Sequence, residues 1–397
     1  MMIDKQTVKF GDICKEVKLT TKDPIADGYE RYIGLEHLDS GSLKIKRWGM
    51  IADDSPSFTR VFKKGQILFG KRRPYLKKAA IAEFDGICSG DIIVMEAKSN
   101  LTHKELLPHI IQSKVMWNWA IQNSSGSLSP RTKFFVLKEL EITLPEKQQM
   151  SHCLEVIDKA QECFDGIDLL HADIYKIKTK LAYDRMLKGN WYRQIFMKPD
   201  EANIPKGWRL TTIGDVLIDT QYGLSEALEK AGEYPVLRMM NITNGYVDPN
   251  DMKYLSSDYG DAEKYTLNKG DLVFNRTNSM EWVGRTGIFE LDDKYLFASY
   301  LIRLVVDESQ VSPFYLNQYL NLPLVQYRLK AFATPGVSQA NINPGSLKSL
   351  PILLPPIDEI ADTDTLLRFF DENIKSVVSQ KHDSMSVLEN LKSEYFS

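Results

Sequence analysis

The sequence predicts an α+β protein with two similar domains, each a mixed β-sheet with helices, separated by two long antiparallel coiled-coil helices in a pseudo-two-fold internal repeat. Three observations lead to this fold class: a repeat the size of a domain, strand and turn patterns that recur in both copies, and a long apolar stripe of helical period after each copy. The chain of 397 residues, 43% hydrophobic and 26% charged, is long enough for more than one globular domain.

The internal repeat consists of short segments that recur in the same order. Residues 10–13 (FGDI) return as residues 213–216 (IGDV), and residues 64–69 (KGQILF) return as residues 269–274 (KGDLVF). The LKEL segment that begins at Leu137 returns as the LKSL segment that begins at Leu347. The offset grows from 203 to 210 along the chain, as a few inserted loop residues would produce. Because the period is the size of a domain, the pattern excludes a solenoid.

Each copy is expected to contain the same elements in the same order. Alternating apolar residues predict strands around each Lys-Gly pair, and Asp85-Gly86 predicts a tight hairpin, because such turns need positive φ angles. In the second copy, residues 292–294 take this place. One helix is then expected over residues 104–122 and another over residues 313–332, where Ser312-Pro313 is typical of an N-cap followed by proline. A polar glycine loop and a short strand ending in proline close each copy.

The two long helices are predicted from apolar residues that recur every three or four positions. The first stripe consists of Met150, Cys153, Ile157, Ala160, Phe164, Ile167, Leu170, Ile174, Ile177 and Leu181. The second consists of Leu367, Phe370, Ile374, Val377, Leu388, Leu391 and Tyr395, with Lys381 and Ser384 loosening the seam. We expect the helices to pack against each other; alternatively, each stripe folds onto its own domain. The predicted division is 1–145 and 199–355 for the domains, and 146–190 and 356–397 for the helices, the first ending near Gly189-Asn190.

Motifs for several kinds of chemistry are absent from the sequence. Pro355-Pro356 lacks the preceding Asn or Asp and the following aromatic residue of an amino methyltransferase, and no G-x-G-x-x-G or P-loop occurs. The triplets at 16–18 and 292–294 have the Asp/Glu-x-Lys order of nucleases, but such triplets are common by chance. Four cysteines without a CxxC pair favour neither zinc nor a redox motif and fit a reducing cytoplasm. No apolar run is long enough to span a membrane.

Two similar domains, each followed by a long helix, resemble the specificity subunits of Type I restriction–modification systems over nearly the whole chain. The resemblance rests on residues 64–69, the turn Arg73-Pro74-Tyr75-Leu76, residues 85–89, and the strand-to-helix junctions at 144–145 and 354–356. It implies a non-catalytic subunit whose two target-recognition domains each read one half of a bipartite double-stranded DNA sequence. The helices would set the gap and dock two methyltransferase subunits, which a restriction–translocase subunit joins. The subunit itself would hold no cofactor, because methyl donor and ATP belong to those partners.

Basic and polar residues after the Lys-Gly strand are the first candidates for DNA contact. In the first copy they are Lys71, Arg72, Arg73, Tyr75, Lys77 and Lys78. The equivalent residues of the second copy are Asn275, Arg276, Thr277 and Asn278, with Arg285 nearby. Arg can bind guanine and Asn can bind adenine bidentately, whereas Lys and Tyr can hold phosphates. The alternative is an ordinary solvated turn.

The glycine loops supply the second set of candidates. In the first copy these are Ser129, Arg131 and Lys133, and in the second copy Gln339 and Asn341 stand where Ser129 and Arg131 stand in the first. Residues 1–145 hold 23 Lys and Arg against 17 Asp and Glu, whereas residues 199–355 hold 14 against 19. Phosphate contact is therefore expected to be stronger in the first copy.

Other functions remain open from the sequence. A fused enzyme is disfavoured by the missing motifs, and a scaffold in which the helices and domains bind proteins is the second alternative. A third is the specificity subunit of a related system whose partner is a fused methyltransferase–nuclease, since that difference lies in the partner.

Overall fold

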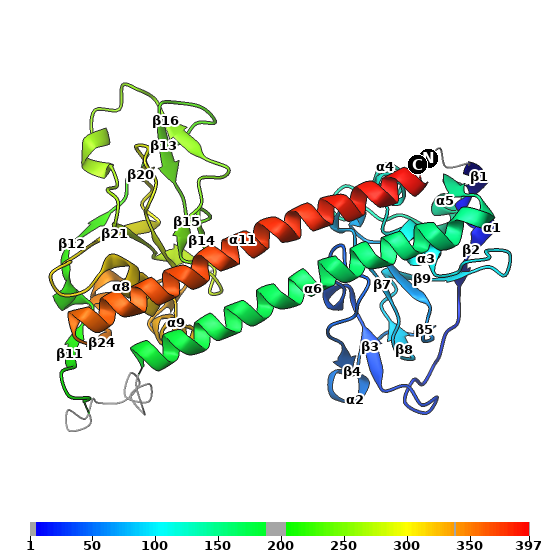
Figure 1. Ribbon diagram of the computed structural model, residues 1–397, viewed down its shortest axis with the longest axis horizontal. Helices are drawn as coiled ribbons and strands as arrows, with labels where there is room; N and C mark the ends of the chain where they lie inside the picture. The colour runs from blue at the N-terminus through cyan, green and yellow to red at the C-terminus, as the bar shows by residue number, and fades with distance from the viewer. Residues whose placement is uncertain (1–4, 188–203, 337–338, 397) are drawn as a thin grey trace. The chain divides into compact units, whose positions relative to one another are not determined.

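The computed structural model describes residues 5–187, 204–336 and 339–396. It divides into two compact units, one made of Met1–Leu169 with Val377–Ser397 and the other of Leu170–Ser376. Each unit holds one globular domain and a part of each long helix, α6 (Lys147–Met186) and α11 (Ile357–Phe396), which Figure 1 shows in green and in red.

The domain of the first unit is built on two four-stranded sheets. In one, the order is β2 (Cys14–Val17), β9 (Ile92–Ala97), β6 (Ile67–Gly70), β7 (Ala79–Ile81), all antiparallel. In the other, the order is β4 (Gly49–Met50), β3 (Arg31–Ile33), β8 (Gly86–Cys88), β5 (Arg60–Phe62), with β3 and β8 parallel. A ribbon of β1 (Lys5–Lys9) and β10 (Glu141–Pro145) closes the domain just before α6.

Short helices cover the first of these sheets. They are α1 (Phe10–Ile13), α3 (Leu106–Ile111), α4 (Lys114–Gln122) and α5 (Phe134–Leu137), whereas the single-turn helix α2 (Ile51–Asp54) packs on the second sheet. Phe69 of β6 stacks on Trp117 of α4 with ring centroids 4.6 Å apart. The core of this unit continues from these rings into Met150, Cys153 and Ile157 of α6. Helix α6 is therefore anchored to the domain that precedes it.

The domain of the second unit contains a six-stranded sheet of order β12-β21-β17-β19-β15-β14. The strands are β12 (Leu217–Tyr222), β21 (Leu301–Val306), β17 (Leu272–Asn275), β19 (Thr286–Ile288), β15 (Tyr246–Val247) and β14 (Ile242–Thr243). A smaller sheet consists of β16 (Lys253–Leu255), β13 (Tyr234–Leu237) and β20 (Leu296–Phe297). A ribbon of β11 (Arg209–Thr212) and β24 (Pro351–Leu354) precedes α11, as β1 and β10 precede α6.

The two domains share these elements, which confirms the predicted repeat of mixed sheets with helices. The Lys-Gly turn that leads into β6 and β17 has glycine at positive φ in both copies, 87° at Gly65 and 90° at Gly270. The carboxylate of Asp85 accepts from Lys63 Nζ at 2.9 Å, and Asp292 pairs with Lys269, which stands one position nearer to the glycine than Lys63 does. A left-handed glycine and a neighbouring ion pair therefore form the same turn twice.

Two local predictions were wrong. The pair Asp85-Gly86 does not form a hairpin, because β8 pairs with β3 and β5 of the second sheet while β9 pairs with β2 and β6 of the first. Gly86 is needed for a different reason, since a Cβ there would lie 2.6 Å from the carbonyl oxygen of Arg31. Each helix expected as one segment is two. Ser113 caps α4 after a break, and Pro323 separates α8 (Pro313–Leu320) from α9 (Pro323–Ala331).

Other local predictions were confirmed. Ser312 caps α8 by accepting a hydrogen bond from the backbone N–H of Tyr315, and proline occupies the first helical position. After the polar loop of the second copy, the structure adds a short helix that the sequence did not predict, α10 (Pro344–Lys348), which Asn343 caps. The proposed stop of the first long helix at Gly189-Asn190 lies outside the described residues, and α6 is described to Met186.

The long helices pack both on a domain and on each other. In the first unit they are antiparallel, since the start of α6 shares a core with Tyr395 and Phe396 of α11, while Asp168 pairs with Lys381. In the second unit, Ala182 and Met186 of α6 join the core that holds Leu367 of α11. The prediction that the helices pack on each other is thus partly right, and so is the alternative that each stripe packs on a domain.

In the second half of the first stripe, some positions predicted to face the other helix are exposed instead. Leu170 and Ile177 are 49% and 56% exposed, whereas Lys178 lies largely buried beside them. The seam carries an ion pair at this point, which the apolar pattern does not indicate. In the second stripe, Leu367, Val377, Leu388 and Tyr395 are buried as predicted. Lys381, expected to loosen the seam, is half-buried and paired.

Candidate nucleic-acid interface

The two candidate segments of the first domain, predicted separately, lie side by side. The segment after β6 carries a single 3-10 turn, η2 (Pro74–Leu76), and the glycine loop crosses it. The backbone N–H of Arg73 donates to the carbonyl of Pro130 at 2.7 Å, and that of Thr132 donates to the carbonyl of Lys71 at 3.0 Å. Arg73 has φ at 52°, so the backbone turns sharply there. The two segments, about 60 residues apart in the sequence, therefore form one surface.

Asp91 and Ser129 organise the arginines of this surface. Asp91 accepts from Arg131 Nε at 2.8 Å and pairs with Arg72 at 3.5 Å, while Ser129 Oγ accepts from Arg72 Nε at 2.9 Å and from Arg73 Nε at 3.3 Å. The hydrogen bond from Arg131 holds the pKa of Asp91 below its usual value. Three guanidinium groups are thus oriented before any ligand arrives, which lowers the entropy cost of binding one.

The other predicted residues of the first domain differ in how accessible they are. Tyr75 is 51% exposed, and Lys133, the N-cap of α5, is also exposed. Lys78 donates its Nζ to the carbonyl of Leu35 at 2.7 Å and so helps to hold the fold. Lys77 is half-buried with φ at 48°, and burial lowers the pKa of Lys71.

The second domain brings its two candidate segments together in the same way. Strand β18 (Thr277–Asn278) pairs with β23 (Ala340–Asn341), and Asn341 Nδ2 donates to Thr277 Oγ1 at 2.7 Å. The backbone N–H of Ile342 donates to the carbonyl of Arg276 at 2.9 Å. Gln339 is exposed immediately before β23. The same two-segment surface therefore recurs with amides in place of arginines.

Arginine–aromatic contacts support this second surface. The guanidinium of Arg276 lies 4.8 Å from the ring centroid of Tyr222, and that of Arg285 lies 3.4 Å from the ring centroid of Trp282. Asn278 is half-buried and accepts from the N–H of Ser279 at 2.8 Å. Asn275 is 1% exposed and donates to the carbonyl of Met239 at 2.9 Å, so it holds the loop from inside and is not available to a ligand.

Sequence reasoning missed three residues of these surfaces. Asp91 is a lone carboxylate in the sequence, and only the fold places it between arginines from two segments. Leu128, at the tip of the first glycine loop, is 92% exposed, and Trp282 is 38% exposed. An apolar residue within a run of serines, and an aromatic residue seven positions after Asn275, were the available signals.

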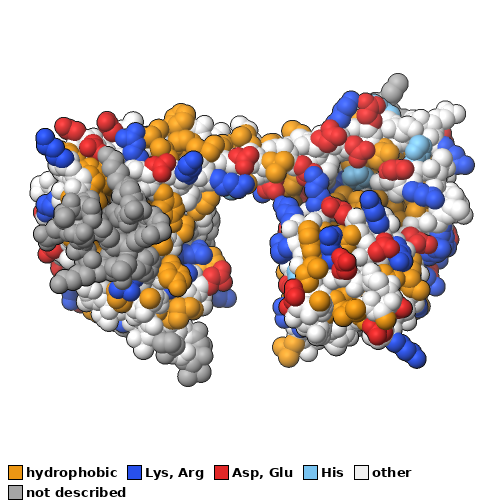
Figure 2. Space-filling view, turned by 90° about the horizontal axis from the view of Figure 1, so that it is seen from below, with side chains coloured by type: hydrophobic (Ala, Val, Ile, Leu, Met, Phe, Trp, Pro, Cys, Tyr) orange, Lys and Arg blue, Asp and Glu red, His pale blue; other side chains and the backbone are white. Residues whose placement is uncertain are grey.

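The charge of the surface is mixed. Figure 2 shows acidic and basic side chains intermingled on the visible face of the first unit. Among the described residues, no three His, Cys, Asp or Glu side chains are grouped so that they could hold a metal ion. In that same part of the chain, no helix is long and apolar enough to cross a membrane.

The two-segment surface of each domain offers oriented hydrogen-bond donors, which suit recognition of base edges and phosphates.

Comparison with known proteins gives matches over most of the chain. The family model described as type I restriction modification DNA specificity domain matches residues 2–165 and 205–391. A protein of Methanocaldococcus jannaschii, named as the MjaX specificity subunit of a type I restriction enzyme, is 30% identical over 189 residues, 47% of this chain and 44% of that protein. The EcoKI specificity subunit of Escherichia coli is 26% identical over 180 residues, 44% of this chain and 39% of that protein. These alignments span less than half of either relative.

Solved structures resemble the fold at low sequence identity. The S subunit of a type I restriction–modification system from M. genitalium has a TM-score of 0.54 at 13% identity, with 100% of this chain and 96% of that chain covered. A structure described as a type I R-M system gives a TM-score of 0.50 at 18% identity, with 100% and 97% covered. At this identity the likeness concerns the fold alone.

Proposed function

We propose, from the premise that the chain belongs to the family of type I restriction modification DNA specificity domains, that it is a non-catalytic subunit which recognises a bipartite double-stranded DNA target. Each domain reads one half-site, with residues 1–145 and 199–355 as the two target-recognition domains. The helices over 146–190 and 356–397 set the gap between half-sites and dock two methyltransferase subunits and a restriction–translocase subunit. These partners supply methyl donor, ATP and catalysis, and the complex works in the cytoplasm, where its DNA is.

The observation that carries this proposal is the surface that occurs twice with different side chains. In both domains the segment after the Lys-Gly strand is hydrogen-bonded through its backbone to the glycine loop. The first presents Arg72, Arg73 and Arg131, whereas the second presents Thr277 and Asn341. A constant backbone with exchanged donors is what a scaffold needs to read two different half-sites. Arginines suit guanine and phosphate, and asparagine suits adenine.

Mapping methylated bases across the genome, with the gene intact and deleted, tests the proposal. A split motif of two short half-sites around a fixed gap should lose methylation when the gene is deleted and regain it when the gene is restored. Purified chain with its partners should also bind that motif more tightly than unrelated DNA, with affinity falling steeply as salt rises. If no split motif depends on the gene in cells that express it, the chain is a protein scaffold. Isolation of a fused methyltransferase–nuclease with the chain would identify the related class of system.

A further inference from the structure

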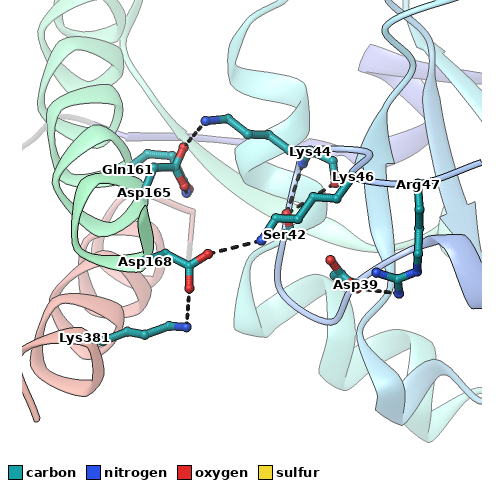
Figure 3. A network of polar contacts seen from close by, with 9 residues as sticks. All are labelled: Asp39, Ser42, Lys44, Lys46, Arg47, Gln161, Asp165, Asp168 and Lys381. Atoms are coloured by element: carbon teal, nitrogen blue, oxygen red, sulfur yellow. Dashed lines mark hydrogen bonds and ion pairs between the residues drawn. The ribbon is translucent and has the colours of Figure 1, made fainter. Parts of the chain in front are cut away.

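In the first unit, an aspartate of α6 joins three parts of the fold. Asp168 accepts from Lys381 Nζ of α11 at 2.5 Å and from Lys46 Nζ at 3.1 Å (Figure 3). Lys46 belongs to the loop of residues 39–47, whose Lys44 reaches Asp165 of α6 at 2.6 Å. The hydrogen bond from Lys381 is the main reason that the pKa of Asp168 lies below its usual value. One carboxylate therefore links a loop of the domain to both long helices.

In the second unit, an aspartate of α11 likewise links the other long helix to its domain. Asp371 accepts from Lys178 Nζ of α6 at 2.5 Å, from the hydroxyl of Tyr246 in β15 at 2.8 Å, and from Gln318 Nε2 of α8 at 3.2 Å. The side chains of Lys178 and Asp371 are 11% and 10% exposed. In the first unit, Asp168 and Lys381 are 31% and 36% exposed. The second link is therefore better shielded from water and salt.

The two ion pairs are related by the internal repeat. Asp371 follows Asp168 by 203 residues, and Lys381 follows Lys178 by the same 203, which is also the offset of the FGDI and IGDV segments. The helices begin at Lys147 and Ile357, an offset of 210. The distance from helix start to aspartate is thus seven residues shorter in α11. Because seven residues are close to two helical turns, the aspartate keeps its face despite the change in length. An ion pair formed by chance would not be expected to recur in both units when the distance from the helix start to the aspartate differs by seven residues.

Backbone hydrogen bonds connect each link to the surface that carries the recognition loops. In the first unit, the N–H of Gly41 donates to the carbonyl of Lys77 at 3.1 Å, and Ser40 forms a β-bridge with Lys78. In the second unit, Tyr246 pairs with Ile288 of β19, and β19 pairs with β17, whose last residue is Asn275. Each aspartate is thus joined to the candidate recognition loop of its own domain through hydrogen-bonded segments.

We propose, resting on the function proposed above, that Asp168 and Asp371 are positioning residues that fix each domain on the helix pair and thereby set the gap accepted between the two half-sites. Neither aspartate touches DNA. Each acts by holding the turn at Gly41 or at Gly245, both at positive φ, against the lysine-paired helices. Without these contacts, each domain can change its angle relative to the helices, and the chain then binds half-sites at other separations.

The test uses the full chain with its methyltransferase partners and a plasmid library in which the gap between the two half-sites varies. The double variants Asp168→Asn with Lys381→Met, and Asp371→Asn with Lys178→Met, remove each ion pair without leaving a buried charge unpaired. The unaltered chain should disfavour a gap changed by one base pair by at least about tenfold, the effect of one lost base contact. The variants should reduce this preference to about threefold or less, while the half-site sequences stay the same.

The controls separate positioning from folding and from the proposed function. Lys176→Met removes an exposed lysine of α6 that pairs with Asp173 of the same helix at 3.3 Å, and it should leave the gap preference unchanged. If the buried pair of the second unit proves necessary for folding, Asp168→Asn alone carries the test at the more exposed pair. An unchanged gap preference, or an equal loss of methylation at every gap, overturns the positioning role. Absence of any split motif with the unaltered chain instead rejects the proposed function.

Discussion

Asp91 holds two arginines of the proposed recognition surface of the first domain, although its charge would oppose binding to DNA phosphates. It accepts from Arg131 and pairs with Arg72, so replacing it with the isosteric asparagine removes both ion pairs and one negative charge, while Arg72 keeps its hydrogen bond to Ser129. We expect Asp91→Asn to raise affinity for unrelated DNA, because repulsion of phosphates falls. Affinity for the target should fall by about tenfold relative to unrelated DNA, because the arginines lose their orientation.

Binding titrations on target and unrelated DNA at one salt concentration measure both effects. Asp85→Asn is the matched control, since Asp85 is a carboxylate of the same domain that pairs with Lys63 rather than with the arginines. It should change the ratio of the two affinities by less than about twofold. A fall in both affinities with Asp91→Asn would mean that the carboxylate supports the fold and not the orientation of the arginines.

Gln339 and Asn341 are expected to specify only one half-site. Asn341 donates to Thr277 Oγ1 at 2.7 Å, which leaves its carbonyl oxygen and second amide hydrogen for a base. Replacing both residues with alanine should relax the sequence read by the second domain at a cost of about 1–3 kcal/mol for each lost bidentate contact. Methylation mapping would show one half of the motif becoming degenerate. Degeneracy in both halves, or in neither, would be incompatible with this assignment.

At the scale of elements, the junction of α8 with α11 predicts a pH effect. Ser312, the N-cap of α8, donates its hydroxyl to Asp364 of α11, and burial raises the pKa of Asp364 to about 6. A carboxyl whose folded-state pKa is raised contributes stability below its unfolded pKa and loses it as pH rises through the folded value. The charged form is therefore unfavourable at neutral pH, and Asp364→Asn removes that cost.

The variant should gain stability over the parent chain as pH rises from about 5 to about 7.5, by about 1–2 kcal/mol. Thermal unfolding midpoints of both chains at the two pH values measure this difference. Asp362→Asn, an exposed aspartate on the same helix, should show no such trend. A difference between Asp364→Asn and the parent chain that is the same at both pH values would rule out titration of Asp364 as its cause.

Helices and strands were predictable from the sequence where they depend on residues close together in the chain. They were not predictable where they depend on pairing between distant strands. The N-cap at Ser312 and the long helices follow from residues close together in the chain. The hairpin at Asp85-Gly86 failed because β8 finds its partners in β3 and β5, which the turn pattern cannot show. The phase at Leu170 and Ile177 failed because the seam there accepts an ion pair in place of an apolar residue.

The candidate site was predictable as two segments in each domain but not as one surface. Residue types indicated Arg72 and Arg131 separately, and only the fold joins them through Asp91. The amide of Asn275 would suit adenine, but the residue is buried, because it lies at the end of the central strand β17. Sequence alone shows which donors are present. Which of them face outward depends on the register of strands.

For the whole molecule, the two ion pairs and the helices between them predict how the gap can be lengthened. Seven residues inserted into α6 between Asp168 and Lys178, with seven more inserted into α11 between Asp371 and Lys381, keep the faces of both helices and both ion pairs. The insertion adds about 10 Å of helix, which corresponds to about three base pairs of DNA. The methylated motif should therefore keep both half-sites and gain about three base pairs between them.

Inserting seven residues into α6 alone is the matched control. It displaces Lys178 from Asp371 while every residue of both proposed recognition surfaces stays unchanged, so methylation of any split motif should be lost. The informative comparison is between the single and the paired insertion, because both lengthen α6 equally and only the paired one restores the antiparallel match. If the paired insertion also abolishes methylation in a folded chain, or leaves the gap unchanged, the helices do not measure the gap, and the separation of half-sites must be set by the partner subunits.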